Sequence, residues 1–274
     1  MKMLRKGFER LYLNLMSRSG FTKFNNLVLK LALRARGYNN FRTLEESGER
    51  FFIDTILMPT APKLCVDVGA NVGDFSEELL RSTQAEVIAF EPLSLCHERL
   101  LTLQRNYPER LTIVKAAVGN SIGKHTIHFE QDATAHASLS EDVKQVAYVK
   151  NTASEEIDVT KLDHYFGSAA QREIDFLKID TEGFEFEVLQ GSKLLIEKNP
   201  PKFVQIEFNW HQLFRGQSLL TLAKLLPRYE VFQLGRGRLL RRDASDPLSN
   251  IYLFSNFVFI RQDIAATLPH LPTR

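Results

Sequence analysis

The stretch Val66-Asp67-Val68-Gly69-Ala70-Asn71-Val72-Gly73-Asp74 decides the fold. It continues an apolar run from Leu64, so the pattern predicts a buried strand that enters a glycine loop. Residues 74–81 then show the spacing of an amphipathic helix. Gly69 permits a sharp turn, and Gly73 permits close approach of the backbone to a ligand or a neighbouring helix. A plain tight turn could use the same glycines, yet open α/β sheets bind nucleotides at such a loop.

Short apolar runs alternate with helical patterns from residue 63 onward. Strands are expected at 64–68, 86–90, 111–118, 174–179 and 203–208, and helices at 74–81, 94–105, 184–197 and 218–226. This alternation predicts an α/β fold with a parallel sheet and crossover helices. Residues 229–234 and 251–260, separated by the turn at 235–237, predict an antiparallel hairpin at one edge.

Two segments interrupt this alternation, and a helix precedes it. Residues 123–129 predict an added strand, whereas residues 131–154 are polar and irregular. Ahead of the first strand, a helix is expected from 46 to 57.

The glycine spacing narrows the class of ligand. It is Gly-x-x-x-Gly and lacks the Gly-x-Gly-x-x-Gly that brings a dinucleotide pyrophosphate onto a helix N-terminus. Asp74, at the start of the helix, would repel a phosphate. The loop therefore favours a phosphate-free ligand with a cationic end, such as S-adenosylmethionine, and an NAD-dependent oxidoreductase is a weaker alternative.

A second signal follows the second strand. Glu91 stands 18 residues after Gly73, where an acid can accept hydrogen bonds from both hydroxyls of a ribose. Pro92 fixes the turn behind it. The alternative is a carboxylate that only supports the start of the next helix.

Four motifs together resemble those of one family. They are the sequences of residues 66–76, Phe-Glu-Pro at 90–92, Ala-Val-Gly-Asn at 117–120 and Leu-Lys-Ile-Asp-Thr-Glu-Gly-Phe-Glu at 177–185. In this order and spacing the chain resembles the FkbM family of S-adenosylmethionine-dependent methyltransferases over residues 60–235. The resemblance implies O-methylation, commonly of sugar or polyketide hydroxyls.

The resemblance also implies a fold, a domain layout and a cofactor site. The fold would be a class I (Rossmann-like) seven-stranded, mostly parallel sheet with one antiparallel edge strand. A basic helical extension would cover residues 1–58 and the methyltransferase domain residues 59–274. Asp67, Gly69 and Asn71 would line the methionine end, Glu91 would hold the ribose, and residues 116–118 would flank the adenine. The full predicted cofactor set is Asp67, Gly69, Ala70, Asn71, Gly73, Phe75, Glu91, Pro92, Ala117 and Asp180.

Carboxylates follow the later strands at the same edge of the sheet. Asp180 and Glu182 are two residues apart, so in a strand they would point the same way. Glu207 and Asn209 repeat the pattern one strand later. These oxygens should meet where the acceptor binds.

Methyl transfer to a hydroxyl needs a group that takes the hydroxyl proton, which typically contributes about 10²–10⁴-fold. The candidate bases are Asp180, Glu182, His136 and His211, of which the two carboxylates are preferred without a ranking between them. Alternatively, both carboxylates cap the following helix and its loop amides. Together with Glu207 they could also hold a divalent cation, although a metal is not expected.

The composition is that of an ordinary globular chain of 274 residues, 44% hydrophobic and 25% charged. Two cysteines fit a reducing compartment, and no run is apolar enough to span a membrane, so a cytoplasmic location is expected. A catalytically inactive cofactor-binding or scaffold protein of glycan assembly stays an alternative to the enzyme. The acceptor, a small molecule or a glycan, and the oligomeric state are not encoded in any motif.

Charge is concentrated at the N-terminus. Residues 1–36 carry nine Lys/Arg and one acid, whereas the rest of the chain is mildly acidic, so no nucleic-acid partner is expected. The segment shows two helical patterns. It could pack on the sheet as a cap, contact the inner face of the membrane peripherally, or bind an acidic carrier or a partner enzyme.

Overall fold

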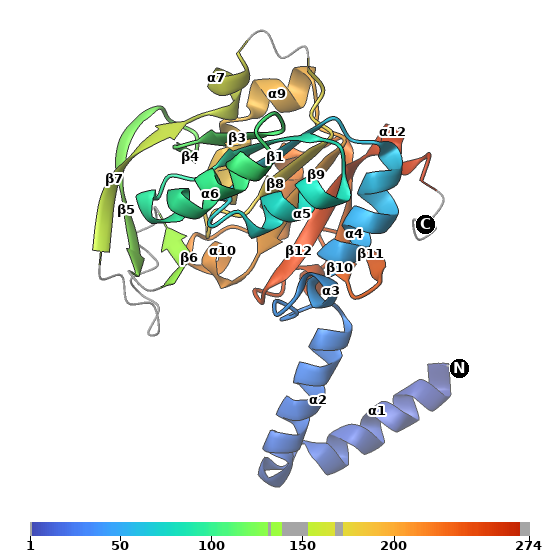
Figure 1. The fold of residues 1–274 in the computed structure, drawn as a ribbon. Helices are drawn as coiled ribbons and strands as arrows, with labels where there is room; N and C mark the ends of the chain where they lie inside the picture. Colours follow the sequence, from blue (N-terminus) through green and yellow to red (C-terminus); the bar gives the residue numbers. More distant parts are fainter. Residues whose placement is uncertain (1, 131–132, 139–152, 168–171, 269–274) are drawn as a thin grey trace.

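The computed structural model describes residues 2–130, 133–138, 153–167 and 172–268. Its centre is an eight-stranded sheet (Figure 1). The strand order is β11 (Arg238–Arg242), β10 (Tyr229–Gly235), β12 (Ser255–Arg261), β9 (Phe203–Phe208), β8 (Phe176–Ile179), β1 (Leu64–Val68), β2 (Glu86–Phe90) and β3 (Leu111–Val114). Strands β9, β8, β1, β2 and β3 run parallel, as the alternating pattern predicts.

The sheet departs from the expected seven strands at its hairpin edge. Strand β12 runs antiparallel to β9 and β10, and it lies between them and not at the edge. Beyond β10, residues 238–242 return as the additional strand β11. Gly237 makes this turn with a φ of 65°, which glycine adopts at little cost. The α/β, mostly parallel class is confirmed, and the difference is one extra strand and the place of the reversed one.

Helices cover both faces of the sheet and build one core on each. Helices α5 (Asp74–Ser82) and α6 (Ser94–Asn106) contribute to the core that includes Cys65 of β1. Helices α8 (Glu185–Gln190), α9 (Lys193–Lys198) and α11 (Leu219–Leu225) contribute to the core with Leu64 and Val66 of the same strand. All five residues of β1 are buried, which is expected of a strand covered on both faces.

Two predicted helices are broken where backbone approaches backbone. A Cβ at Gly191, between α8 and α9, would lie 1.9 Å from the carbonyl oxygen of Gly119. The helix expected at 46–57 is likewise interrupted at Gly48, which has a φ of 87° and separates α3 (Leu44–Ser47) from α4 (Glu49–Phe52). Phe52, Ile53, Ile56 and Leu57 are buried in the same core as α5. Sequence periodicity cannot show these breaks, because each depends on a distant segment.

A second sheet stands beside the first and is the largest feature that the sequence pattern missed. Its order is β4 (Ala117–Val118), β7 (Ala153–Thr160), β5 (Gly123–Glu130) and β6 (Ala133–Ser138). The strand expected at 111–118 is therefore two, because β3 ends at Val114 and Ala117 pairs with Val159 of β7. The added strand at 123–129 is confirmed as β5.

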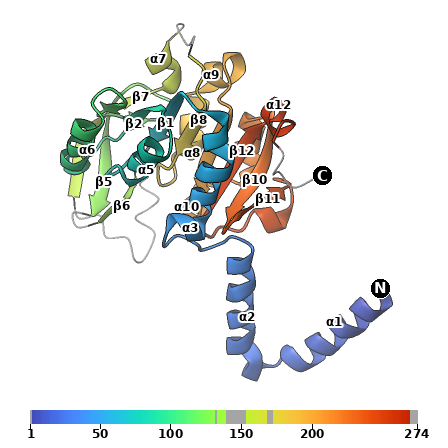
Figure 2. The ribbon, with the colours of Figure 1, turned by 45° about the vertical axis from the view of Figure 1, so that its right-hand side comes forward.

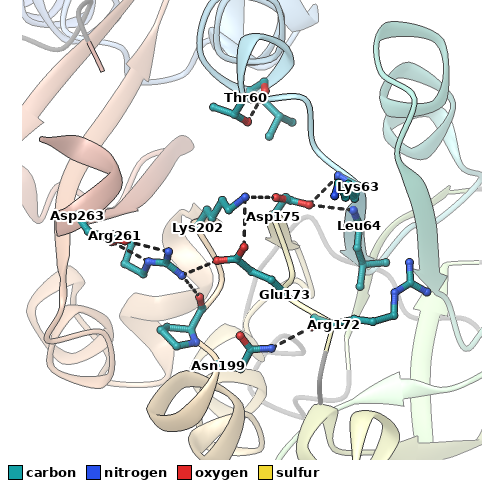
Figure 3. A network of polar contacts seen from close by, with 12 residues as sticks. Thr60, Lys63, Leu64, Arg172, Glu173, Asp175, Asn199, Lys202, Arg261 and Asp263 are labelled. Carbon is teal, nitrogen blue, oxygen red and sulfur yellow. Dashed lines mark hydrogen bonds and ion pairs between the residues drawn. The ribbon is translucent and has the colours of Figure 1, made fainter. Parts of the chain in front are cut away.

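The amino ends of the central strands are tied together by a network of ion pairs (Figure 3). The Asp175 carboxylate accepts hydrogen bonds from the backbone N–H groups of Lys63 and Leu64 and, at 2.6 Å, from Lys202 Nζ. Lys202 and Arg261 also contact Glu173. We call these residues the amino-edge network; they link β1, β8, β9 and β12.

The two predicted N-terminal helices are present as α1 (Lys2–Met16) and α2 (Thr22–Ala35), and they project from the rest of the molecule (Figures 1 and 2). Helix α2 has no buried residue, so it is not a cap packed on the sheet. Its C-terminal end is held where Arg238 and Arg242 donate to the carbonyls of Ala35 and Arg36. None of the described helices has the length and apolar character to cross a membrane.

Candidate active site

A cavity opens at the carboxyl ends of β1, β2 and β8. Its lining residues are Val68, Gly69, Asn71, Phe90, Glu91, Pro92, Ala117, Val118, Ile127, Asp180, Thr181, Glu182 and Phe184. The structure thus brings the glycine loop, the Phe-Glu-Pro motif and the carboxylates after β8 to one place. This is the edge at which the strand-end argument expects them.

Gly69 fixes the distance between the loops after β1 and β8. Its φ is 83°, and a Cβ there would lie 1.8 Å from the carbonyl oxygen of Asp180. No side chain fits without separating the two loops. Gly73 does not line the cavity; it begins α5 and packs against Leu100 of α6, which is the second of the two roles proposed for it.

Glu91 forms one end of the cavity. One carboxylate oxygen accepts the N–H of Asn71 at 2.9 Å, and the other accepts the N–H of Leu93 at 2.9 Å. The side chain is nearly buried, and burial raises the pKa of Glu91 to about 7 despite these two bonds. Each oxygen keeps a lone pair for a further donor, which is what a ribose diol would supply.

Apolar side chains surround this end. Phe90 and Pro92 come with the motif, Ala117 and Val118 come from β4, and Ile127 comes from β5. A flat aromatic base would fit such a wall. Ile127 was missed from the sequence, because its contribution depends on the second sheet.

Two other carboxylates, Asp180 and Glu182, line the cavity, and Glu207 lies beside them. Asp180, Glu182 and Glu207 each offer an oxygen, and these oxygens all lie within 4.8 Å of one another. Burial, followed by the charges of Asp180 and Glu182, raises the pKa of Glu207 well above its usual value. Oxygen ligands in such a set suit a divalent cation, so the metal hypothesis keeps a geometric basis.

Glu185 shapes the loop that carries two of these carboxylates. Its Oε1 accepts hydrogen bonds from the N–H groups of Thr181 and Gly183, and its Oε2 accepts one from Gln212. Asp180 and Glu182 were weighed as acceptors for these loop amides; the structure gives that role to Glu185. Glu182 lies inside the loop with a φ of 52°, a conformation that costs energy in a non-glycine residue and clusters at functional sites.

Asp180 forms an ion pair with a buried lysine. Lys178 Nζ lies 2.7 Å from Asp180 Oδ2 and 4.0 Å from Asp67 Oδ1. Burial alone would lower the pKa of Lys178, but the charges of Asp180, Asp67 and Glu49 raise it. Lys178 was missed from the sequence, although a lone charge in the apolar strand Phe176–Ile179 is a signal that a buried partner exists.

Glu182 has a different partner. Its Oε2 lies 3.0 Å from Nε2 of His211, which is 2% exposed. Burial lowers the pKa of His211 to about 4, so the imidazole is neutral at pH 7 and forms no ion pair with the adjacent carboxylate. His211 does not line the cavity itself. This ranks Glu182 above Asp180, and above His211, as the group that can take a proton.

Several predicted residues lie away from the cavity wall. Asp67 is fully buried behind the loop and accepts a hydrogen bond from Ser76 of α5 at 2.6 Å. Phe75 packs on Phe176, and Ala70 is buried in the same core. His136 belongs to β6, but its side chain is outside the described part of the structure.

The charge of the cavity bears on the ligand class. Among its described lining residues, Glu91, Asp180 and Glu182 are acidic and none is Lys or Arg. A pyrophosphate would meet only repulsion from these side chains, whereas a cationic, phosphate-free nucleoside would be attracted. The residues present therefore fit S-adenosylmethionine and not a dinucleotide.

Comparison with known proteins finds related sequences. The family described as "Methyltransferase FkbM domain" matches residues 67–236. 2-O-methyltransferase NoeI of Sinorhizobium fredii (strain NBRC 101917 / NGR234) is 26% identical over 201 residues, or 66% of this chain and 78% of that protein. Methyltransferase sdnD of Sordaria araneosa is 30% identical over 167 residues, or 50% of this chain and 63% of that protein, so the match spans less than two thirds of this relative.

Solved structures are similar only at a distance. An rRNA methylase from Streptococcus thermophilus aligns with a TM-score of 0.42 and 12% identity, over 78% of this chain and 93% of that one. A precorrin-6Y C5,15-methyltransferase from Geobacter metallireducens aligns with a TM-score of 0.41 and 9% identity, over 78% and 86%.

Proposed function

The chain belongs to the FkbM methyltransferase family, and we propose that it transfers a methyl group from S-adenosylmethionine to a hydroxyl of a sugar or glycan. The observation that carries the proposal is a single cavity with two unlike ends. At one end Glu91 is held by two backbone amides beside an apolar wall. At the other, Glu182 lies 3.0 Å from a neutral histidine.

In this proposal Glu91 accepts hydrogen bonds from the two ribose hydroxyls, and the wall of Ala117, Val118 and Ile127 contacts the adenine. Asn71 and Gly69 also line the cavity. When bound, S-adenosylmethionine supplies an electrophilic methyl group on a sulfonium.

Glu182 then acts on the acceptor. The hydroxyl oxygen forms the new bond to the methyl carbon as the carbon–sulfur bond breaks, and Glu182 takes the hydroxyl proton. The hydrogen bond from Lys178 fixes the position of Asp180, so that Asp180 orients the acceptor by accepting hydrogen bonds from its hydroxyls. His211, neutral and 3.0 Å from the Glu182 carboxylate, adds no positive charge beside it.

Two observations support a hydroxyl group on the acceptor. Three carboxylates gather at the acceptor end, and carboxylates are strong acceptors for hydroxyl donors. The relative from Sinorhizobium fredii is named a 2-O-methyltransferase, which supports oxygen as the methylated atom.

The proposal is tested by calorimetric titration with S-adenosylhomocysteine and by turnover with a labelled methyl donor on a panel of glycans. Binding of S-adenosylhomocysteine, no binding of NAD, and label transfer to a glycan are expected. Binding without transfer to any member of the panel would favour the catalytically inactive scaffold. Binding of NAD alone would overturn the methyl-donor assignment.

A further inference from the structure

The two N-terminal helices carry apolar side chains that nothing in the described structure covers. On α1, Phe8, Leu11 and Leu15 recur at helical spacing and are 72%, 58% and 46% exposed. These three positions lie on one face of the helix. Lys6 and Arg10 lie on the opposite side of the same helix.

Helix α2 repeats the arrangement. Phe24, Leu27 and Leu31 form its exposed apolar stripe, with Lys23 and Lys30 along one border. The two helices are joined at their bend, where Tyr12 donates to Asn25 and Asn25 donates to the carbonyl of Met16. The pair therefore presents two amphipathic helices held at a defined corner, which we call the arm (residues 2–36).

The positive charge of the arm favours an anionic surface over a second copy of the arm as its partner. Nine Lys/Arg and the single acid Glu9 lie in residues 1–36. Pairing with the arm of a second copy would bring like charges together, which disfavours association through these helices. An anionic lipid surface offers both an apolar layer for the stripes and negative headgroups for the lysines. We propose that the arm binds flat on an anionic membrane surface.

The point of attachment gives this contact a direction. The carbonyl of Gly37 accepts a hydrogen bond from Ser255 at 3.2 Å, and the N–H of Asn39 donates to Phe254 at 2.8 Å. Ser255 pairs with Phe208, the last residue of β9, so the arm leaves the molecule at the carboxyl edge of the sheet. This is the edge that holds the cavity. A membrane-bound arm therefore keeps that edge near the lipid, where an acceptor carried on a lipid would be presented; this last step rests on the proposed function.

The test is flotation of the full-length chain with vesicles. Phosphatidylcholine vesicles containing roughly one third phosphatidylglycerol are compared with vesicles of phosphatidylcholine alone. The double variant Lys23→Glu/Lys30→Glu reverses two exposed charges of α2. A matched control, Arg105→Glu/Lys198→Glu, reverses two exposed charges on α6 and α9, away from the arm.

We expect the wild-type chain to float with the anionic vesicles only and to be released by high salt. Each basic residue at the surface contributes roughly fivefold to partition, so the arm variant should lose about 30-fold or more while the control keeps wild-type binding. A third variant, Leu27→Gln, should also weaken binding, because it removes apolar contact without changing the charge of the arm.

Three outcomes would overturn the proposal. They are equal flotation with neutral vesicles, equal loss in the control variant, and no flotation together with arm-dependent dimers in sedimentation velocity. None of these measurements uses methyl transfer, so the lipid contact and the proposed reaction fail or succeed separately.

Discussion

Both edges of the central sheet carry a lysine paired with carboxylates, but the two groups of residues have different roles. At the amino edge, Asp175 receives two backbone N–H groups and Lys202, so both of its oxygens are engaged in joining strands (Figure 3). At the carboxyl edge, Lys178 is surrounded by more carboxylates than it can neutralise, and Asp180 faces a cavity. Because a pocket adjoins both edges, the difference teaches that an ion pair marks a reactive site when its acids outnumber their donors.

The largest effect should come from the proposed base. Glu182→Gln removes the proton acceptor but keeps its size, so kcat should fall about 10²–10⁴-fold. Affinity for S-adenosylhomocysteine should stay near that of the wild type, because Glu182 is at the acceptor end. The matched control at the amino edge is Glu173→Gln, which should leave kcat unchanged. Wild-type turnover in Glu182→Gln would remove it from this role, and an equal loss in the control would erase the contrast between the edges.

The next effect concerns stability. Lys178→Met strands buried carboxylates without their cation, which should cost about 3–5 kcal/mol in the free energy of unfolding. Lys202→Met removes the corresponding lysine of the amino edge, which is 22% exposed. It should cost less, about 1 kcal/mol. Urea unfolding of both variants measures the contrast; equal losses would show that the two lysines are equivalent.

A smaller effect is expected from Glu91. Glu91→Ala should weaken S-adenosylhomocysteine binding tenfold or more, because a lost hydrogen bond to a charged group costs about 1.5–3 kcal/mol. Glu86, the first residue of the same strand, lies at the amino edge and provides the control Glu86→Ala. Calorimetry should show an unchanged affinity for that control. If both variants bind alike, the ribose assignment is wrong.

The smallest predicted effect is a pH dependence. With a pKa of about 7, Glu91 is mostly protonated at lower pH, and its ionised form is the better acceptor for ribose hydroxyls. Affinity for S-adenosylhomocysteine should therefore rise by up to about tenfold as pH passes from one unit below to one unit above that pKa. Binding should also release protons, which calorimetry in buffers of different ionisation enthalpy detects. In Glu91→Gln the affinity should be low and flat with pH.

The same raised pKa acts on folding in the opposite direction. Because the folded-state value lies above the ordinary 4.5, the protonated side chain favours the folded state. That contribution is fully present below 4.5 and is lost as pH rises through about 7. Ionisation of Glu91 therefore lowers the folding stability and places a negative charge in the cavity.

The sequence predicted those parts of the site that follow from position along a strand. Gly69, Glu91 and Asp180 come directly after parallel strands, so their meeting at one edge needs no knowledge of the side chains around them. The pairing of Lys178 with Glu49 and Asp67 joins residues far apart in the chain, and no local pattern encodes it. The positive φ of Glu182 was not predicted either, since the hydrogen bonds from its loop to Glu185 form only in the folded structure.

The fold shows the same division. Alternating apolar runs located the parallel strands, because each is buried on both faces. The second sheet was missed where β7 exposes alternate residues and reads as a polar segment. The eighth strand, β11, was missed because Arg238–Arg242 is mostly basic.

The contact between Gly69 and the Asp180 carbonyl has a mechanical consequence. Because the two backbones are in direct contact, the loop after β1 and the loop after β8 should move together. In the proposed function the first would bind the methyl donor and the second would bind the hydroxyl. Sliding either along its strand axis forces the other to follow. Pairing of β1 with β8 therefore fixes the relative position of the two binding loops before either reactant binds.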